Sequence, residues 1–220
     1  IYTDYYTLSL HDALPIYMAS NTGGTITFSG ASQSLTTGTS TAVTSIANLG
    51  ATINFTGGAL VITTTSGTGF SATGGGTINV TGANNTITST TGSPVNIANT
   101  TIGASNVTFK SVSCNGASNG IVLNTTGASG GFVVTGTGTT DGSGGTIQNI
   151  TNRGVSAFST TNLSLKNMAF TNASMVDGPG PCGAADNSGC NAAIHLNTVT
   201  TATLDNVDIS GTTAEEGINV

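Results

Sequence analysis

The stretch from residue 51 to residue 80, ATINFTGGALVITTTSGTGFSATGGGTINV, contains three short triplets in which a variable residue separates two apolar residues. The triplets occupy residues 53–55, 60–62 and 78–80, and glycines and hydroxyl-bearing residues fill the segments between them. Apolar residues at every second position are typical of a β-strand that buries one face. Strands this short are not stable as an isolated hairpin, so the pattern predicts a solenoid in which each strand pairs with the next turn.

The same pattern continues on both sides of this stretch. Further apolar triplets or pairs lie at residues 26–28, 95–97, 107–109, 121–123, 133–134, 163–165, 194–196 and 204–209. Ile53 and Ile78 are 25 residues apart, and Ile194 and Ile218 are 24 residues apart. These spacings predict rungs of about 22–25 residues.

Two spacings between equivalent positions are too long for one rung. Ile121, Val155 and Ile194 take equivalent places in the pattern, but they are 34 and 39 residues apart. The excess predicts surface loop insertions at residues 136–145 and 175–190, since both segments are rich in turn residues.

Glycine and asparagine mark the bends between the expected strands. Gly120, Gly154 and Gly217 each precede an apolar strand residue, and we expect them to enter a bend with a positive φ angle. Asparagine recurs just before or within strands, where we expect a left-handed conformation and a hydrogen bond to its copy in the next rung. The asparagines concerned are Asn106, Asn162, Asn167 and Asn206.

Four segments resemble a known group of repeat proteins. GIVLNTT at 120–126, NLSLKNMAFTNAS at 162–174, AAIHL at 192–196 and ATLDNVDISG at 202–211 are similar to bacterial proteins of the pectin-lyase-like superfold. They also resemble the long Gly/Thr/Asn-rich repeat proteins that bacteria export to their surface. The resemblance implies an all-β, right-handed parallel β-helix solenoid. It leaves the activity open, because this fold hosts lyases, hydrolases, adhesins and inert spacers.

The two ends of the chain read differently from the repeat. Residues 1–17, IYTDYYTLSLHDALPIY, contain all four tyrosines of the chain and no glycine. Within them, TLSLHDALPI resembles translated sequencing-adapter read-through, and the alternative is a genuine capping segment. We therefore expect residues 18–220 to form a single β-helix fragment. Residues 216–220 read as the start of another rung, which predicts truncation at the C-terminus.

The composition excludes several classes of partner. Charged residues make up only 5% of the 220 residues, the net charge is −6, and the three cations are Lys110, Arg153 and Lys166. Three cations are too few to contact successive phosphates of a nucleic acid or to bind an anionic bilayer. We therefore expect neither a nucleic acid nor a membrane surface as a partner. No apolar run approaches the roughly 20 residues of a membrane-spanning helix.

Two of the three cysteines bracket part of the second predicted insertion. Cys182 and Cys190 enclose seven residues, GAADNSG, which favours a local disulfide and an oxidising compartment. Two free thiols are the alternative. No third or fourth ligand lies nearby in the sequence, so no metal site is predicted. Cys114 is expected to be a small core residue.

His195, Asp205 and Asp208 are the candidates for ligand contact. Alternation within their strands places all three on the outside of the solenoid. Outward carboxylates are the groups from which this fold builds calcium sites and glycosidase acid–base pairs. The signatures of a lyase or polygalacturonase are missing, and Arg153 lies in the expected turn at 151–154. No catalytic residue, metal or cofactor is therefore predicted, and ordinary surface groups are the alternative reading.

Two functions are consistent with these observations. The first is an exported bacterial surface solenoid with a structural or adhesive role and no catalysis, which suits the neutral exterior. The second is a carbohydrate-active or glycan-binding β-helix, although the chain has no Trp and no Tyr after residue 17 to form a sugar platform. Both place the chain in a secreted or cell-surface location. The expected partners are an extracellular glycan, a host or cell surface, and further rungs of the same chain.

Overall fold

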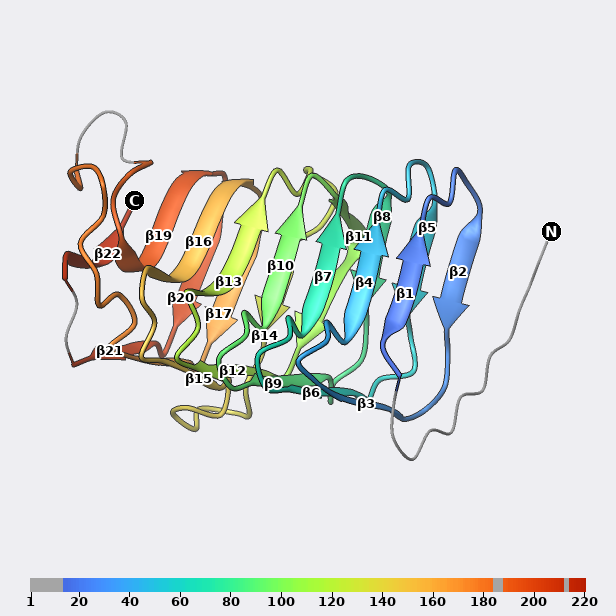
Figure 1. Cartoon of the computed structure of the whole chain (residues 1–220), viewed down its shortest axis with the longest axis horizontal. Helices are drawn as coiled ribbons and strands as arrows, with labels where there is room; N and C mark the ends of the chain where they lie inside the picture. Colours follow the sequence, from blue (N-terminus) through green and yellow to red (C-terminus); the bar gives the residue numbers. More distant parts are fainter. Residues whose placement is uncertain (1–13, 184–187, 212–213) are drawn as a thin grey trace.

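The chain folds into a solenoid of parallel β-strands (Figure 1). The computed structural model describes residues 14–183, 188–211 and 214–220. Within these residues there are about seven turns, three parallel sheets and no helix, so the predicted all-β solenoid is confirmed. The turns follow one another along the long axis of the molecule, from the N-terminal residues at one end to the C-terminal residues at the other.

Each turn contributes strands to three sheets, which we term A, B and C. Sheet A consists of β1 (Ile16–Ala19), β4 (Val43–Ile46), β7 (Phe70–Thr73), β10 (Val95–Ala98), β13 (Asn119–Asn124), β16 (Arg153–Thr160), β19 (Ala192–Val199) and β22 (Glu216–Asn219). Sheet B consists of β2 (Thr25–Phe28), β5 (Thr52–Phe55), β8 (Thr77–Val80), β11 (Thr101–Phe109), β14 (Phe132–Val134), β17 (Leu163–Lys166) and β20 (Ala202–Asp205). Sheet C consists of β3 (Gln33–Gly38), β6 (Leu60–Thr64), β9 (Thr86–Ser89), β12 (Ser111–Asn115), β15 (Thr146–Gln148), β18 (Ala169–Thr171) and β21 (Asp208–Ser210).

The rungs average about 27 residues, slightly more than the predicted 22–25. The pairs from which the length was predicted are real, since Ile53 pairs with Ile78 and Ile194 pairs with Ile218. Those two steps are among the shortest in the molecule, and the two loop insertions lengthen other steps. The spacing was therefore read correctly at particular positions but did not represent the average.

The loop insertions lie where the long spacings placed them. Ile121 pairs with Val155, and Val155 pairs with Ile194, so these three residues occupy one row of sheet A. Residues 136–145 and 175–190 contain no strand among the residues described. The two turn-rich loops thus lie outside the strands of the solenoid, and the rungs that follow them keep their register.

The inward side chains of all three sheets form one continuous core. Ile78 and Ile102 pair between neighbouring rungs and are fully buried. Phenylalanines add edge-to-face contacts along the stack, with ring centroids 5.8 Å apart for Phe55 and Phe70 and 5.9 Å apart for Phe70 and Phe109. Burying each such side chain contributes about 1.5–3 kcal/mol, so contacts between rungs hold the solenoid together.

Three of the four asparagines singled out in the sequence lie at corners between sheets, whereas Asn106 lies within β11. All four have the left-handed conformation that was predicted. Asn106, Asn162, Asn167 and Asn206 all have positive φ angles, between 54° and 65°. The amide of Asn206 donates to the side-chain oxygen of Asn167 in the preceding rung at 2.8 Å. The side-chain oxygen of Asn106 instead accepts the backbone N–H of Gly131 at 2.9 Å. These bonds satisfy corner groups that the sheet ladders leave unpaired.

The glycines at the second position of three sheet A strands do not have the conformation that was predicted. Gly120, Gly154 and Gly217 do not have positive φ angles. A Cβ atom on Gly154 would lie 2.5 Å from the carbonyl oxygen of Ala193, and one on Gly120 would collide with the carbonyl oxygen of Gly154. Gly120 and Gly154 are therefore required because successive turns approach closely there, not because the backbone bends.

The first strand includes two residues of the atypical N-terminal segment. Ile16 and Tyr17 belong to β1 and pair with Val43 and Thr44. The solenoid thus begins slightly before residue 18. Residues 1–13, which make up most of that segment, lie outside the described residues.

Candidate functional site

The three predicted ligand-contact residues lie on three different sheets. His195 is on β19 in sheet A, Asp205 ends β20 in sheet B, and Asp208 begins β21 in sheet C. Asn206, with a φ angle of 54°, turns the chain between the two aspartates. The three side chains therefore leave the solenoid from different faces and do not converge on one ligand.

Asp205 and Asp208 are both exposed, and neither is in register with another carboxylate among the residues that the structure describes. Asp205 pairs in register with Lys166, and their side chains form an ion pair with a Nζ–Oδ2 distance of 3.0 Å. Asp208 pairs in register with Ala169. A partly exposed ion pair of this kind contributes roughly 0–1 kcal/mol. These two aspartates do not supply the clustered oxygens that a calcium ion requires.

His195 was predicted to lie on the surface, and this is wrong, because its side chain is fully buried. It does point away from the solenoid core, in register with Ser156 and Asn219 on the outer face of sheet A. Its ring centroid lies 5.1 Å from that of Phe158, and neither ring nitrogen has a hydrogen-bond partner in the described structure. Burial, and then the charge of Arg153, lower the pKa of His195 to about 4.

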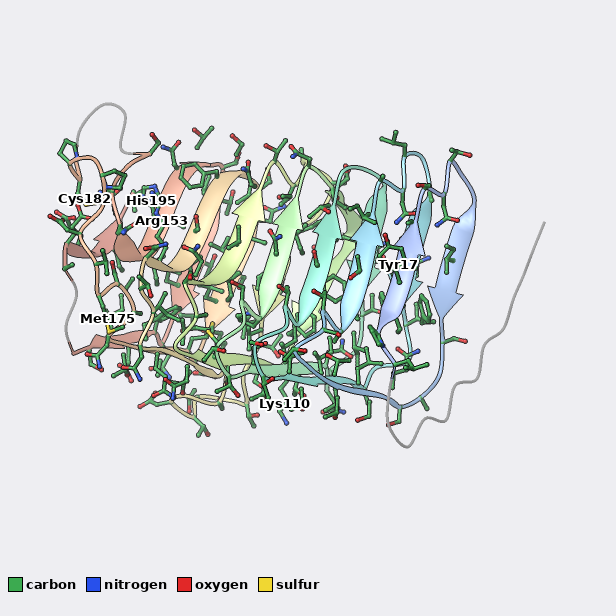
Figure 2. All side chains as sticks on the ribbon, viewed as in Figure 1. Tyr17, Lys110, Arg153, Met175, Cys182 and His195 are labelled. Atoms are coloured by element: carbon green, nitrogen blue, oxygen red, sulfur yellow. A yellow bond between two sulfur atoms is a disulfide. The ribbon has the colours of Figure 1, made fainter. Side chains whose placement is uncertain are left out.

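The second insertion is bonded to the start of β16 in sheet A, a contact that strand alternation alone could not indicate. We term residues 175–183 and 188–191 the strap. Arg153, expected in a turn, is in fact the first residue of β16. Its Nε donates to the carbonyl oxygen of Cys190 at 2.9 Å, and its Nη2 donates to that of Ser188 at 2.5 Å. Arg153 thus fastens the strap at the C-terminal end of the solenoid, close to His195 (Figure 2).

Glu215 holds the strap from the last described rung. Its Oε2 accepts the backbone N–H of Gly178 at 2.9 Å and that of Asn191 at 2.6 Å. Burial lowers the pKa of Arg153, and the carboxylate of Glu215 acts in the opposite direction. Sequence reasoning did not connect Glu215 with the strap, because no local pattern links it to a loop 24 or more residues earlier.

Cys182 and Cys190 are joined by a disulfide, the pairing that the sequence favours over two free thiols. Their Cα atoms are 4.8 Å apart. Glu215 Oε1 lies 3.4 Å from Cys182 Sγ, and Glu216 Oε2 lies 3.8 Å from Cys190 Sγ. The described part of the chain contains one group of three side chains that could ligate a metal and whose donor atoms lie within 4.8 Å of one another. This group consists of Cys182, Cys190 and Glu215. In the disulfide form, the two sulfurs bond to each other.

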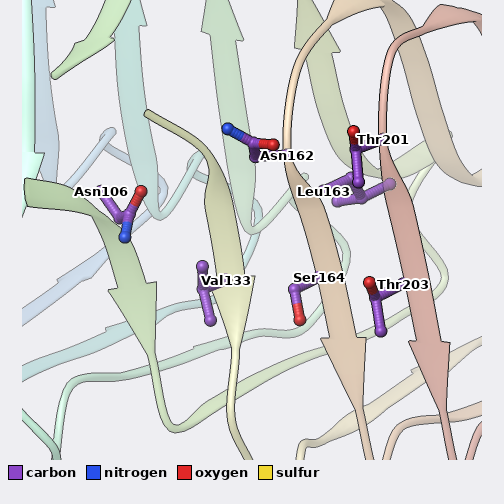
Figure 3. Close-up of a pocket in the computed structure, with 7 residues that line it drawn as sticks. All are labelled: Asn106, Val133, Asn162, Leu163, Ser164, Thr201 and Thr203. Atoms are coloured by element: carbon purple, nitrogen blue, oxygen red, sulfur yellow. The ribbon is translucent and has the colours of Figure 1, made fainter. Parts of the chain in front are cut away.

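A shallow hollow of about 280 Å³ lies on the outer face of sheet B (Figure 3). It is lined by Asn106, Val133, Asn162, Leu163, Ser164, Thr201 and Thr203. Val133, Ser164 and Thr203 form one row across β14, β17 and β20. The lining offers hydroxyl and amide groups for hydrogen bonds, with no charge and no aromatic ring. Sequence analysis treated Asn106 and Asn162 only as corner residues.

Comparison with known proteins found no matching family model, no matching curated protein and no matching solved structure. The class of the protein therefore rests on its own strand register, which defines a parallel β-solenoid with three sheets. No helix in the described residues is long and apolar enough to cross a membrane.

Proposed function

We propose that the chain is part of an exported bacterial surface protein in which the solenoid has a structural or adhesive role without catalysis. The observation that carries this proposal is the neutral exterior, built from hydroxyl and amide side chains that repeat in register. Thr36, Thr63 and Thr88, for example, form one exposed row across β3, β6 and β9. Such a row keeps a long stack hydrated while presenting no charged patch to steer a charged partner. The disulfide supports export to an oxidising compartment.

The positions of the candidate reactive groups support the same proposal. A hydrolase or lyase needs an acid, a base or a nucleophile, and stabilising groups that converge on one point. His195 is buried beside Phe158, Asp205 is paired with Lys166, and Asp208 lies on another face. Among the described residues, these three groups therefore lie in three separate environments and do not converge.

A cleavage assay on a panel of neutral and acidic polysaccharides tests this proposal. New reducing ends report hydrolysis, and ultraviolet absorbance of unsaturated products reports elimination. We expect no cleavage by the parent protein or by the double variant Asp205→Asn/Asp208→Asn. Cleavage by the parent that disappears in the double variant would contradict the proposal and would assign catalysis to those carboxylates.

The hollow on sheet B favours a second candidate function, which is recognition of a neutral glycan. Its hydroxyl and amide lining matches the hydroxyl groups of a sugar, and its volume is at the small end of ligand sites. Without an aromatic platform, binding is expected to be weak. Retention on insoluble polysaccharides should be lost in Ser164→Phe, which fills the hollow, and kept in Ser71→Phe, which alters an outward serine of sheet A. Equal retention of both variants would exclude the hollow as the binding site.

A further inference from the structure

The cysteine pair of the strap lies against two carboxylates that come from a distant part of the chain. Glu215 and Glu216 sit at the start of the last described strand, and each places a carboxylate oxygen within 3.8 Å of one sulfur. The sequence offers no third ligand near the cysteines, but the fold brings these carboxylates to them. Thiolate and carboxylate together are a ligand set that zinc accepts.

We propose that, when the disulfide is reduced, Cys182, Cys190 and Glu215 bind a thiophilic divalent cation such as Zn²⁺, with Glu216 or water as the fourth ligand. The three donor atoms already lie within 4.8 Å of one another. A tetrahedral zinc ion with ordinary bond lengths places its ligand atoms roughly 3.5–3.8 Å apart. After reduction the two sulfurs, which are bonded in the oxidised form, must therefore separate by side-chain rotation to complete the site.

Glu215 is already held in place for this role. Its Oε2 accepts two backbone N–H groups of the strap, which directs Oε1 toward Cys182 Sγ. Orienting contacts of this kind around a ligand strengthen metal binding, often by 10- to 100-fold. Cys190 is buried and Cys182 is half-buried, so the ion would be partly shielded from water.

The chemistry of the switch is balanced. A dithiol reductant transfers two hydrogen atoms to the Cys182–Cys190 disulfide, which leaves two thiols and converts the reductant to its own disulfide. The cation then displaces the two thiol protons to solvent and binds two thiolates. In the oxidised state the disulfide closes the strap on itself, and Glu215 ties the strap to the last described rung through hydrogen bonds. In the reduced state the metal would join both cysteines of the strap to Glu215.

Metal titration of the full chain in its oxidised and reduced forms tests the proposal. The protein is reduced anaerobically with a trialkylphosphine, which becomes a phosphine oxide by taking oxygen from water and does not compete strongly for zinc. Zn²⁺ uptake is measured directly, and Co²⁺ is used as a probe because thiolate ligation produces a sulfur-to-cobalt charge-transfer band. We expect one ion per reduced chain, with that band present, and no comparable site in the oxidised chain.

Three variants separate the proposed ligands from the remaining groups. Cys182→Ser should weaken binding on the order of 100-fold, and Glu215→Gln should weaken it about tenfold or more. Asp208→Asn removes an exposed carboxylate on another face and should leave binding unchanged. Cys114 does not compete, because it is buried in the core and burial raises its pKa to about 12.

Several outcomes would overturn the proposal. These are the absence of binding after reduction, cobalt binding without the charge-transfer band, and equally tight binding to the oxidised chain. Equal losses in Glu215→Gln and Asp208→Asn would also overturn it. If Glu215→Gln loosens the strap and fails to fold, the comparison of oxidised and reduced parent protein still tests whether reduction creates the metal site, because it requires no substitution.

Discussion

Gly154 shows how closely successive turns approach one another at single positions. A Cβ atom there would lie 2.5 Å from the carbonyl oxygen of Ala193 and 3.0 Å from the ring of Phe170, so Gly154→Ala must push two rungs apart. We expect the free energy of unfolding to fall by about 2 kcal/mol or more, measured by urea denaturation. Gly23→Ala is the matched control, because nothing lies within 4 Å of its added Cβ. Equal stabilities of the two variants would contradict the close approach.

His195 predicts a pH dependence of stability. Its pKa in the folded protein is about 4, lowered from 6.5 first by burial and then by Arg153. Because the unfolded chain binds the proton more tightly, the stabilising effect is complete above about pH 6.5 and is lost as the pH falls toward 4. We expect a loss of up to about 3 kcal/mol over this window in urea denaturation.

The matched variant for this prediction is His195→Leu, which keeps an apolar contact with Phe158 and cannot be protonated. Subtracting its stability curve from that of the parent isolates the contribution of His195 from that of other titrating groups. If the two curves are parallel between pH 7 and pH 4, the histidine is not buried in the folded protein.

At the scale of structural elements, the strap depends on its disulfide. Closing a loop of this size contributes about 2–3 kcal/mol. Reduction in the presence of a chelator should therefore speed hydrogen exchange of the backbone amides of Gly178 and Asn191, both of which donate hydrogen bonds to Glu215. Exchange in β9, remote from the strap, should not change.

Non-reducing digestion and mass spectrometry should recover Cys182 linked to Cys190, whereas two free thiols in material from an oxidising compartment would contradict the pairing.

Some structural elements could be predicted from the sequence, and others could not. The strands around Ile53, Ile78 and Ile121 were predictable, because apolar alternation is local and recurs at rung spacing. The burial of His195 and the position of the strap were not predictable, since the strap has no repeat and is held by contacts of Arg153 and Glu215 with distant residues.

The aspartates illustrate a second limit of sequence reasoning. Alternation correctly placed Asp205 and Asp208 on the outside, because Leu204, Val207 and Ile209 pack against the core. It could not show that the corner at Asn206 sends them to two different sheets. Side chains only three positions apart therefore face separate surfaces of the solenoid.

At the scale of the whole molecule, stability is a sum of contacts between neighbouring rungs. Each rung buries its apolar side chains against the next, and the outer surface consists largely of neutral groups. A fold of this kind extends by adding rungs without changing its surface chemistry, which is what a spacer or an adhesive stalk requires. The register between rungs is therefore the central structural claim.

Cysteine cross-linking tests that register most directly. Thr63 and Thr88 are exposed partners on β6 and β9, and neighbouring strands lie about 4.8 Å apart, within the Cα range of a disulfide. Thr36 and Thr88 are two strands apart, about 9.6 Å, which is too far. We predict that Thr63→Cys/Thr88→Cys forms an internal disulfide on mild oxidation and that Thr36→Cys/Thr88→Cys does not. A free Thr63→Cys/Thr88→Cys pair, or equal cross-linking of both pairs, would contradict the solenoid described above.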